Sequence, residues 1–95
     1  MAKYHVLYWK DIPSVVEAND GPDSVKRQLS DRFQVLIDAV AMHLGLAGTD
    51  EYLDQWEHGE EQERPGTARE VADAVLKELE DRFAEFRARG LGERT

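Results

Sequence analysis

The segment that begins at Thr67 constrains the fold most, because it predicts one long amphipathic helix. Thr67 and Glu70 have the spacing of a capping box, in which each side chain accepts a hydrogen bond from the other residue's backbone amide. Large apolar residues then recur every three or four positions as far as Phe86, and Gly90 ends the pattern. We therefore predict a helix over residues 68–89. Its single apolar stripe needs another layer of structure to cover it.

The same segment carries three oppositely charged pairs at i,i+4 spacing in the order that favours a helix. We expect each pair to form an ion bridge along the helix surface. The pairs are Asp73–Lys77, Glu78–Arg82 and Glu85–Arg89.

A second helix is predicted over residues 31–44. Ser30 is a candidate N-cap, and Gly45 followed by Leu46 is typical of a helix that ends in a left-handed residue with an apolar contact after it. The residues that should face the core recur at helical spacing. They are Phe33, Leu36, Ile37, Val40 and Leu44.

Three further apolar residues, Val35, Ala39 and Met42, widen the apolar surface of this helix beyond one stripe. The interpretation that we favour is burial between the sheet and the second helix. The alternative is an edge that faces a partner, because contiguous exposed apolar surface often marks an interaction site.

The N-terminal third of the chain predicts β-structure. Residues 3–9 are rich in aromatic and other β-favouring types and carry apolar bulk on both faces, which is typical of a central strand, and residues 14–18 form a second, shorter strand. Residues 19–22, Asn-Asp-Gly-Pro, predict a hairpin turn. Residues 24–29 alternate like a third strand, although a capped early helix is the alternative. Residues 55–62 are polar and could add an edge strand.

Together these elements predict an α+β fold, a small and mostly antiparallel sheet of three or four strands with two main helices packed on one face. We expect a single domain over residues 1–90 and a frayed tail over residues 91–95. The chain has no Cys, which excludes a disulfide scaffold. Without an apolar run of membrane-spanning length or a leader-like segment, the expected compartment is the cytoplasm.

The charge balance is acidic, with 12 Lys and Arg against 20 Asp and Glu and a net charge of -8. This balance argues against nucleic-acid binding, which needs cations to displace the counterions of the phosphates. Residues 49–63 hold seven of the acids and no Lys or Arg. Such a run is usually a solvated face, and its functional interpretation is a docking surface for a basic partner.

Motifs of known catalytic chemistry are missing from the sequence, which has no Gly-x-Ser-x-Gly, Walker A or Gly-x-Gly-x-x-Gly pattern. The three histidines, His5, His43 and His58, are scattered and lack the spacing of a metal site. We therefore expect no catalytic residue, no metal and no cofactor in the isolated chain.

Large aromatic side chains are numerous for a domain of this size, and we expect most of them to lie in the core. Trp and Tyr also dominate protein interfaces. The best candidate for an exposed recognition feature is Trp9-Lys10-Asp11, at the end of the first predicted strand. The Tyr and Trp residues are Tyr4, Tyr8, Trp9, Tyr52 and Trp56.

Two motifs support a resemblance to a known family. Residues 8–13, Tyr-Trp-Lys-Asp-Ile-Pro, resemble the Tyr-Trp-Arg-Asp-Ile-Pro signature of a small bacterial family called virulence factor, with Lys10 in place of Arg. Residues 45–53, Gly-Leu-Ala-Gly-Thr-Asp-Glu-Tyr-Leu, and Trp56 extend the likeness, which covers roughly residues 3–83. The same domain ends the longer proteins called conserved virulence factor C.

The resemblance implies a role without a catalytic assignment, since the family has no established catalytic residues. Its stand-alone members look to be encoded near methylenetetrahydrofolate reductase and corrinoid methyl-transfer proteins. That placement implies an accessory subunit of one-carbon metabolism that docks on one of these enzymes.

Three functional hypotheses follow. The first is a non-catalytic accessory module that docks on a larger enzyme. The second is a domain that binds a small pterin- or folate-like ligand, with aromatic rings stacking on the heterocycle and Asp11 accepting from its amide edge. The third is a homodimer that pairs through the second apolar helix face. For the first, the predicted contact residues are Trp9, Lys10, Asp11, Arg32, Tyr52 and Trp56.

Overall fold

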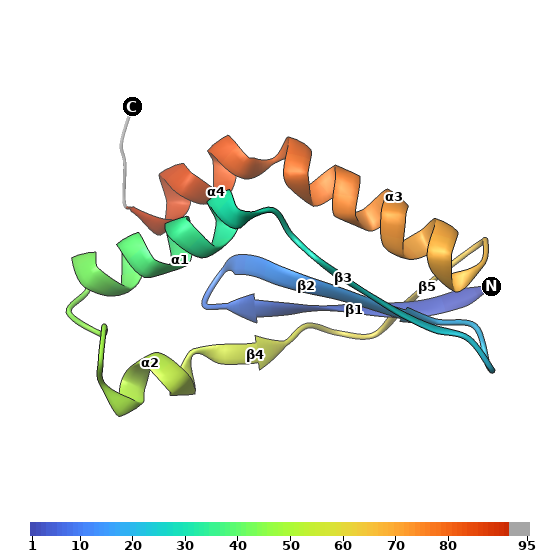
Figure 1. The fold of residues 1–95 in the computed structure, drawn as a ribbon, viewed down its shortest axis with the longest axis horizontal. Helices are drawn as coiled ribbons and strands as arrows, with labels where there is room; N and C mark the ends of the chain where they lie inside the picture. The colour runs from blue at the N-terminus through green and yellow to red at the C-terminus, as the bar shows by residue number, and fades with distance from the viewer. Residues whose placement is uncertain (92–95) are drawn as a thin grey trace.

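The computed structural model describes residues 1–91, which form a five-stranded antiparallel sheet with helices packed against it (Figure 1). The strand order is β3-β2-β1-β4, and β5 pairs with β1 beyond the end of β4. The α+β class is confirmed, with five strands where three or four were predicted. The strands are β1 (Ala2–Trp9), β2 (Ile12–Asn19), β3 (Ser24–Gln28), β4 (Trp56–His58) and β5 (Gln62–Arg64).

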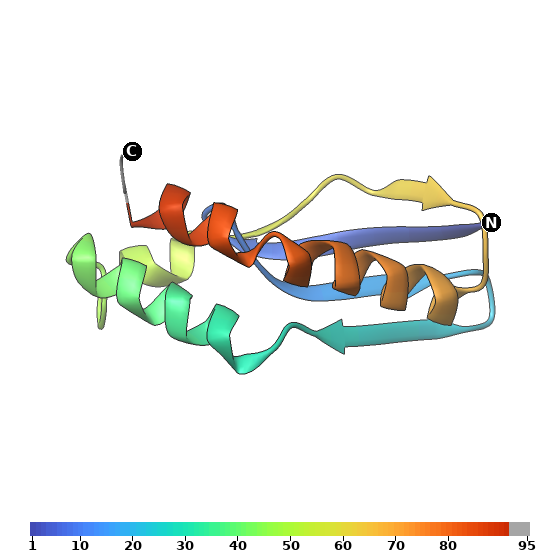
Figure 2. The ribbon, with the colours of Figure 1, turned by 90° about the horizontal axis from the view of Figure 1, so that it is seen from above.

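Three of the four helices cover one face of the sheet. Figure 1 shows α1, α3 and α4 on one side of the strands and α2 on the other, and Figure 2 shows α1 beside α4. The buried apolar side chains between these layers form one core. The helices are α1 (Asp31–His43), α2 (Asp50–Asp54), α3 (Ala68–Asp81) and α4 (Phe83–Gly90).

Strand β1 is central, as its apolar content on both faces predicts. One edge pairs with β2, and the other pairs with β4 near Trp9 and with β5 near Ala2. The predicted edge strand over residues 55–62 is therefore two short strands. Residues 59–61 separate these two strands. Among them only Gly59 bonds to the backbone of β1, through its amide and the Val6 carbonyl at 2.8 Å.

The β1–β2 turn is tighter than the sequence indicated. Lys10 and Asp11 alone form it, with Lys10 in the left-handed region at φ 55°. Strand β2 then begins at Ile12, two residues before the predicted start at residue 14, so that predicted boundary is wrong. Pro13 pairs with Tyr8 beside a register shift, where a missing amide is tolerated.

The β2–β3 hairpin confirms the predicted turn and settles residues 24–28 as strand. Asp20 donates its amide to the Asp23 carbonyl at 3.1 Å, and Gly21 has a φ of 108° that favours glycine. The Asp20 carboxylate also accepts from the Ala68 amide at 3.0 Å. The hairpin turn is thereby tied to the first turn of α3.

Helix α1 ends as predicted but begins differently. At its end the Gly45 amide bonds to the Met42 carbonyl and the Leu46 amide bonds to the Ala41 carbonyl, which is the Schellman pattern. At its start the Ser30 side chain does not cap the helix. It bonds to a carboxylate on α3 instead, as described below.

The predicted helix over residues 68–89 is two helices that meet at Arg82. The capping box of Thr67 and Glu70 is present in full. Arg82 leaves the helical conformation, with φ -99° and ψ 12°. The break lets α4 change direction and pack Phe83 and Phe86 against Phe33, with ring centroids 5.1 and 6.2 Å apart. Tertiary packing therefore overrides a continuous helical pattern.

Ion pairing along this segment follows helix spacing only in part. Of the three predicted pairs, Glu85–Arg89 forms, at 3.1 Å. The other expected partners bond elsewhere. Two pairs reach the sheet, Arg27–Asp73 and Arg64–Glu78, and two keep helix spacing, Lys77–Asp81 and Arg82–Glu85. The predicted frayed tail falls mostly on residues 92–95, outside the described part of the chain, and the single-domain boundary at residue 90 stays a prediction.

Candidate functional site

Trp9 is a core residue, so the prediction that its indole is exposed is wrong. Its exposed fraction is 0%, and its Nε1–H donates to the backbone carbonyl of Tyr52 at 2.8 Å. The Trp9 and Tyr52 rings lie 5.3 Å apart, and Trp56 pairs with Trp9 across β1 and β4. A buried indole with its N–H satisfied cannot reach a partner directly.

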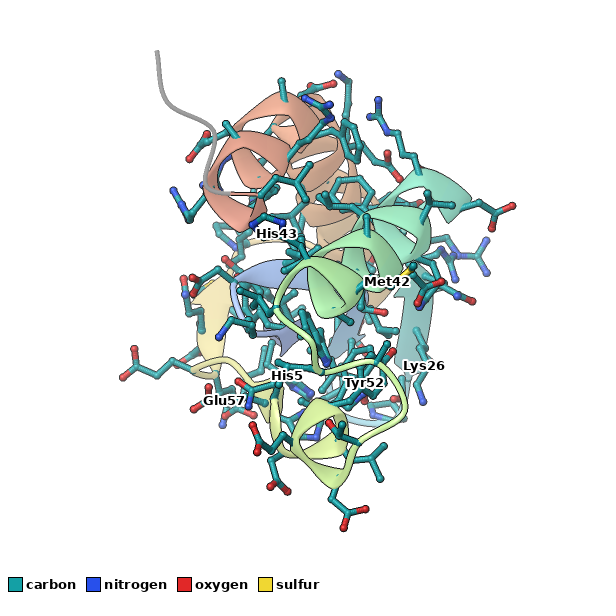
Figure 3. All side chains as sticks on the ribbon, turned by 90° about the vertical axis from the view of Figure 1, so that its left-hand side faces the viewer. His5, Lys26, Met42, His43, Tyr52 and Glu57 are labelled. Atoms are coloured by element: carbon teal, nitrogen blue, oxygen red, sulfur yellow. The ribbon has the colours of Figure 1, made fainter. Side chains whose placement is uncertain are left out.

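Tyr52 and Trp56 surround Trp9 and remain partly exposed. Their rings meet edge to face with centroids 6.4 Å apart. The structure thus brings together three of the six predicted contact residues, as a cluster that joins α2 to the end of β1. Tyr52 also lines a hollow on the surface together with Met42, and both residues are labelled in Figure 3.

Lys10 and Asp11 are exposed on the β1–β2 turn and lie in a different place. They line a cleft together with Tyr8, Arg82 and Arg89, from β1 and the helical layer. The backbone amide of Lys10 is fixed by the Gln55 carbonyl at 3.0 Å. Their side chains, unlike that of Trp9, are free to meet a ligand or partner.

Arg32 lies apart from the other predicted residues and already has partners. Its guanidinium bonds to the Glu80 carboxylate at 3.0 Å and to the Glu80 carbonyl at 2.7 Å. It also lies 4.5 Å from the centroid of the Phe83 ring, in cation–π geometry. These contacts give Arg32 a structural role in joining the start of α1 to the end of α3. The six predicted residues therefore divide into three separate groups.

The same Glu80 carboxylate also binds Ser30, the residue that precedes α1. Ser30 donates both its amide, at 2.6 Å, and its hydroxyl, at 2.8 Å, to Glu80. Burial alone raises the pKa of the Glu80 carboxyl, but the hydrogen bonds from Ser30 and Arg32 outweigh it and lower the pKa below its ordinary value. A tertiary carboxylate thus stabilises the helix start where sequence predicted a local cap.

The outer face of α1 carries an apolar surface that the sequence analysis assigned to the core. Val35 is 65% exposed and Met42 is 73% exposed, so the favoured interpretation of burial is wrong for both. With Ala39 they lie within about 60° of arc on the helix, opposite the buried side, because successive residues turn by ~100°. We call Val35, Ala39 and Met42 the α1 crest. The alternative interpretation, a face open to a partner, is the one that this geometry allows.

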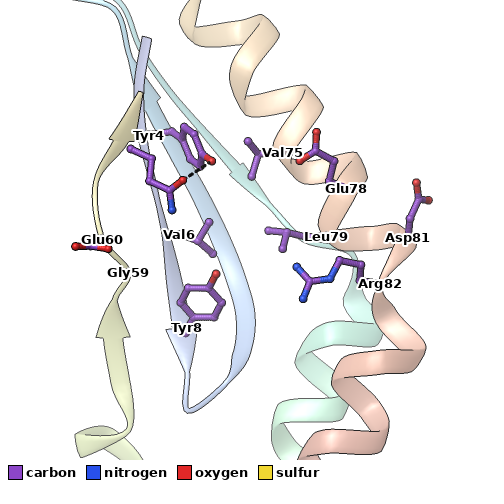
Figure 4. A pocket seen from close by; sticks show the side chains of 11 residues that line it. Tyr4, Val6, Tyr8, Gly59, Glu60, Val75, Glu78, Leu79, Asp81 and Arg82 are labelled. Atoms are coloured by element: carbon purple, nitrogen blue, oxygen red, sulfur yellow. Dashed lines mark hydrogen bonds between the residues drawn. The ribbon is translucent and has the colours of Figure 1, made fainter. Parts of the chain in front are cut away.

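A second surface feature was missed by the sequence analysis: a cleft of about 560 Å³ between β1 and α3 (Figure 4). Tyr4, Tyr8 and Arg82 contribute polar atoms to its wall, and Tyr4 donates to the Gln62 side chain at 3.2 Å. Burial raises the pKa of the Tyr8 phenol above its ordinary value, although the positive charge of Arg82 opposes this shift.

Gly59 makes the shape of this cleft possible. A Cβ at residue 59 would lie 3.0 Å from Cε2 of Tyr8 and 3.1 Å from the carbonyl oxygen of Val6. A side chain here would require the Val6 carbonyl or the Tyr8 ring to shift by a few tenths of an ångström, so glycine favours this close approach. A glycine inside a predicted polar edge strand was the available sequence signal for this approach.

The structure brings two of the scattered histidines together. The His5 and His58 rings are 5.1 Å apart, and His5 Nε2 is buried without a hydrogen bond, 3.9 Å from the nearest Glu17 carboxylate oxygen. Within residues 1–91, however, no group of three or more His, Asp or Glu side chains is arranged to hold a metal ion. The pair therefore has no metal-site geometry.

The acidic stretch of residues 49–63 covers α2, β4 and β5. All seven of its carboxylates are exposed, and none forms an ion pair with another described residue. In contrast, the acids of α3 and α4 at positions 73, 78, 80, 81 and 85 have basic partners. The negative charge of this stretch is therefore not compensated by an ion pair among the described residues.

These features define a class: a small α+β domain with a helix layer on one face of an antiparallel sheet and an exposed apolar helix crest. The chain belongs to the virulence factor family, whose model, described as Virulence factor, matches residues 7–91. This match confirms the resemblance drawn from the two sequence motifs. No curated protein and no solved structure matches the chain. No helix within residues 1–91 has the length and apolar character to cross a membrane.

Proposed function

We propose that this chain is a non-catalytic interaction module that docks on a larger protein through the α1 crest. One observation carries the proposal: two large apolar side chains, Val35 and Met42, are 65% and 73% exposed on the outer face of a well-anchored helix. Removing such a side chain from water is worth about 1.5–3 kcal/mol. A partner that covers the crest gains this free energy.

The anchoring of α1 favours binding because the surface is ordered in advance. Glu80 holds the helix start through Ser30 and Arg32, and the Schellman bonds to Met42 and Ala41 close its end. A preorganised surface loses less conformational entropy when a partner covers it. The side chains of the crest are also short enough, except for Met42, to lose little rotamer freedom.

The family resemblance suggests the first partners to test. They are a methylenetetrahydrofolate reductase and a corrinoid methyltransferase from the organism that encodes this chain. The purified enzyme and this chain are mixed and passed over a sizing column. We expect co-elution with the wild-type chain and loss of co-elution with the double variant Val35→Asp, Met42→Asp. The control double variant Arg69→Ala, Lys77→Ala makes the same change in net charge on exposed positions of α3 and should still bind.

Each outcome bears on a separate part of the proposal. If neither enzyme co-elutes, the partner assignment is wrong. If an enzyme binds the crest variant as well as the wild type, the surface assignment is wrong. The same column tests the homodimer hypothesis, since a dimer that pairs through the crest would become monomeric in the double variant.

A second candidate function, binding of a small pterin- or folate-like ligand, is favoured by the cleft beside the β1–β2 turn. Tyr8 offers a partly buried ring there, Asp11 an acceptor and Lys10 a cation for a carboxylate. Calorimetric titration with folates tests it, using Asp11→Asn as the variant that removes the acceptor charge. If the wild type gives no binding heat, or if Asp11→Asn gives the same binding heat as the wild type, this candidate function is contradicted.

A further inference from the structure

The hollow between α1 and α2 points to the chemistry of the docking partner. It has a volume of about 400 Å³, and its walls include Met42 from α1 and Tyr52 from α2. Ala41, Ala47 and Gly48 complete most of the lining, so the surface is largely apolar. Such a hollow accepts an apolar side chain of a partner.

One acidic residue lines this hollow, and others lie on the short helix that forms one of its walls. Asp38 lines it directly, and α2 carries Asp50, Glu51 and Asp54 on the same five-residue helix as Tyr52. From residue 33 to residue 63 the chain contains eight Asp or Glu and no Lys or Arg. The stretch includes the crest, both sides of the hollow, β4 and the first two residues of β5.

An apolar hollow next to a segment rich in carboxylates and without Lys or Arg selects one kind of partner. Lys and Arg side chains beside the inserted apolar residue would pair with carboxylates that have no other ion-pair partner among the described residues. A nucleic acid or an acidic peptide would be repelled by the same charges. Leu53 on α2 is 64% exposed and adds apolar surface to the helix that carries Tyr52.

We infer that the partner contributes a basic amphipathic segment, with one apolar face against Met42, Tyr52 and Leu53 and with Lys or Arg facing Asp50, Glu51 and Asp54. This inference rests on the proposed docking function and deepens it. It names the chemistry of the segment that the α1–α2 surface recognises, whichever protein carries that segment.

The test uses a fluorescein-labelled 14-residue amphipathic peptide of Leu and Lys, and its counterpart of Leu and Glu, in anisotropy titrations with the full chain. We expect saturable binding of the Leu/Lys peptide that weakens as salt is raised, and no binding of the Leu/Glu peptide. Met42→Ser should weaken binding severalfold by removing one wall of the hollow. Because Met42 is exposed, this variant should keep the native far-ultraviolet circular dichroism.

Two triple variants locate the charge effect. Asp50→Asn, Glu51→Gln, Asp54→Asn removes three charges from α2, the helix that carries Tyr52, and should weaken binding about five- to tenfold, from three pairs of about 0.3–0.5 kcal/mol each. Glu60→Gln, Glu61→Gln, Glu63→Gln removes the same net charge away from the hollow. It should change the affinity by less than about twofold.

The results separate this inference from the proposed function. Equal weakening by the two triple variants, equal binding of both peptides, absence of Leu/Lys binding, or no effect of Met42→Ser would each overturn the inference. The proposed function is decided independently by co-elution with the purified enzymes. An enzyme that binds through the crest while the peptide test fails would leave the docking function standing and refute only the basic partner.

Discussion

The indole Nε1 of Trp9 lies 2.8 Å from the backbone oxygen of Tyr52, and this hydrogen bond ties the central strand to the short helix α2. The two residues are 43 positions apart in the sequence. Helix α2 has no buried residue of its own, so its placement depends on Tyr52 and on the contacts around Trp9. The contact between Trp9 and Tyr52 therefore has a structural role, because it positions α2, which forms one side of the candidate docking surface.

Replacing Trp9 by Phe should destabilise the protein by about 1–3 kcal/mol, because it removes the donor to the Tyr52 carbonyl and leaves a cavity. Urea unfolding followed by circular dichroism measures the loss. The control is Trp56→Phe, whose ring is partly exposed and makes no side-chain hydrogen bond to a described residue, and it should cost under about 1 kcal/mol. Equal costs would contradict the structural role of Trp9.

The Glu80 carboxylate should make stability depend on pH in the acidic range. Its pKa is lowered in the folded state, so its contribution is present above the unfolded pKa and is lost as the pH falls through the folded pKa. We expect the unfolding free energy of the wild type to fall below about pH 5. Glu80→Gln should be less stable at pH 7 and show a shallower fall. Parallel pH profiles for the two proteins would contradict this prediction.

Gly59→Ala should destabilise the protein by about 1–3 kcal/mol through overpacking. The new methyl group would meet the Val6 carbonyl oxygen, which is backbone and cannot rotate away, and the Tyr8 ring. Thermal unfolding measures the change. The neighbouring variant Glu60→Ala alters an exposed side chain and should stay within about 0.5 kcal/mol of the wild type. If Gly59→Ala unfolds at the same temperature as the wild type, residue 59 does not lie this close to Val6 and Tyr8 in solution.

Gly45→Ala should cost about 1–2 kcal/mol because residue 45 has a φ of 72°, a left-handed conformation that a Cβ disfavours. No atom outside its neighbours lies within 4 Å of the added Cβ, so the cost is conformational rather than steric. Gly45→Asn should lose less, since Asn tolerates this region. Chemical denaturation of both variants gives the ranking, and a reversed order would refute the explanation.

Local sequence signals predicted the elements that depend on local physics. The capping box of Thr67 and Glu70, the hairpin turn at Asp20 and Gly21 and the helix end at Gly45 were each found as predicted. In each case a few neighbouring residues supply both the donor and the acceptor, or the required φ. No contact with a distant part of the chain is needed to recognise them.

Predictions of exposure failed where distant segments decide the outcome. Trp9 is buried because Tyr52 covers it, and Val35 and Met42 are exposed because α4 packs on another side of α1. An apolar residue has the same sequence signature whether it faces a core or a partner. Only the arrangement of the helices in space separates these two cases.

The sequence by itself determined the class of fold, the helix and turn boundaries that local bonds fix, the acidic charge and the family motifs. The tertiary structure alone decided the break at Arg82, the ion partners of Glu78 and Glu80, and the exposure of the α1 crest. The physical reason is the range of the interactions. Capping and turn formation act within four residues, whereas burial and charge pairing depend on which distant segments come to lie together.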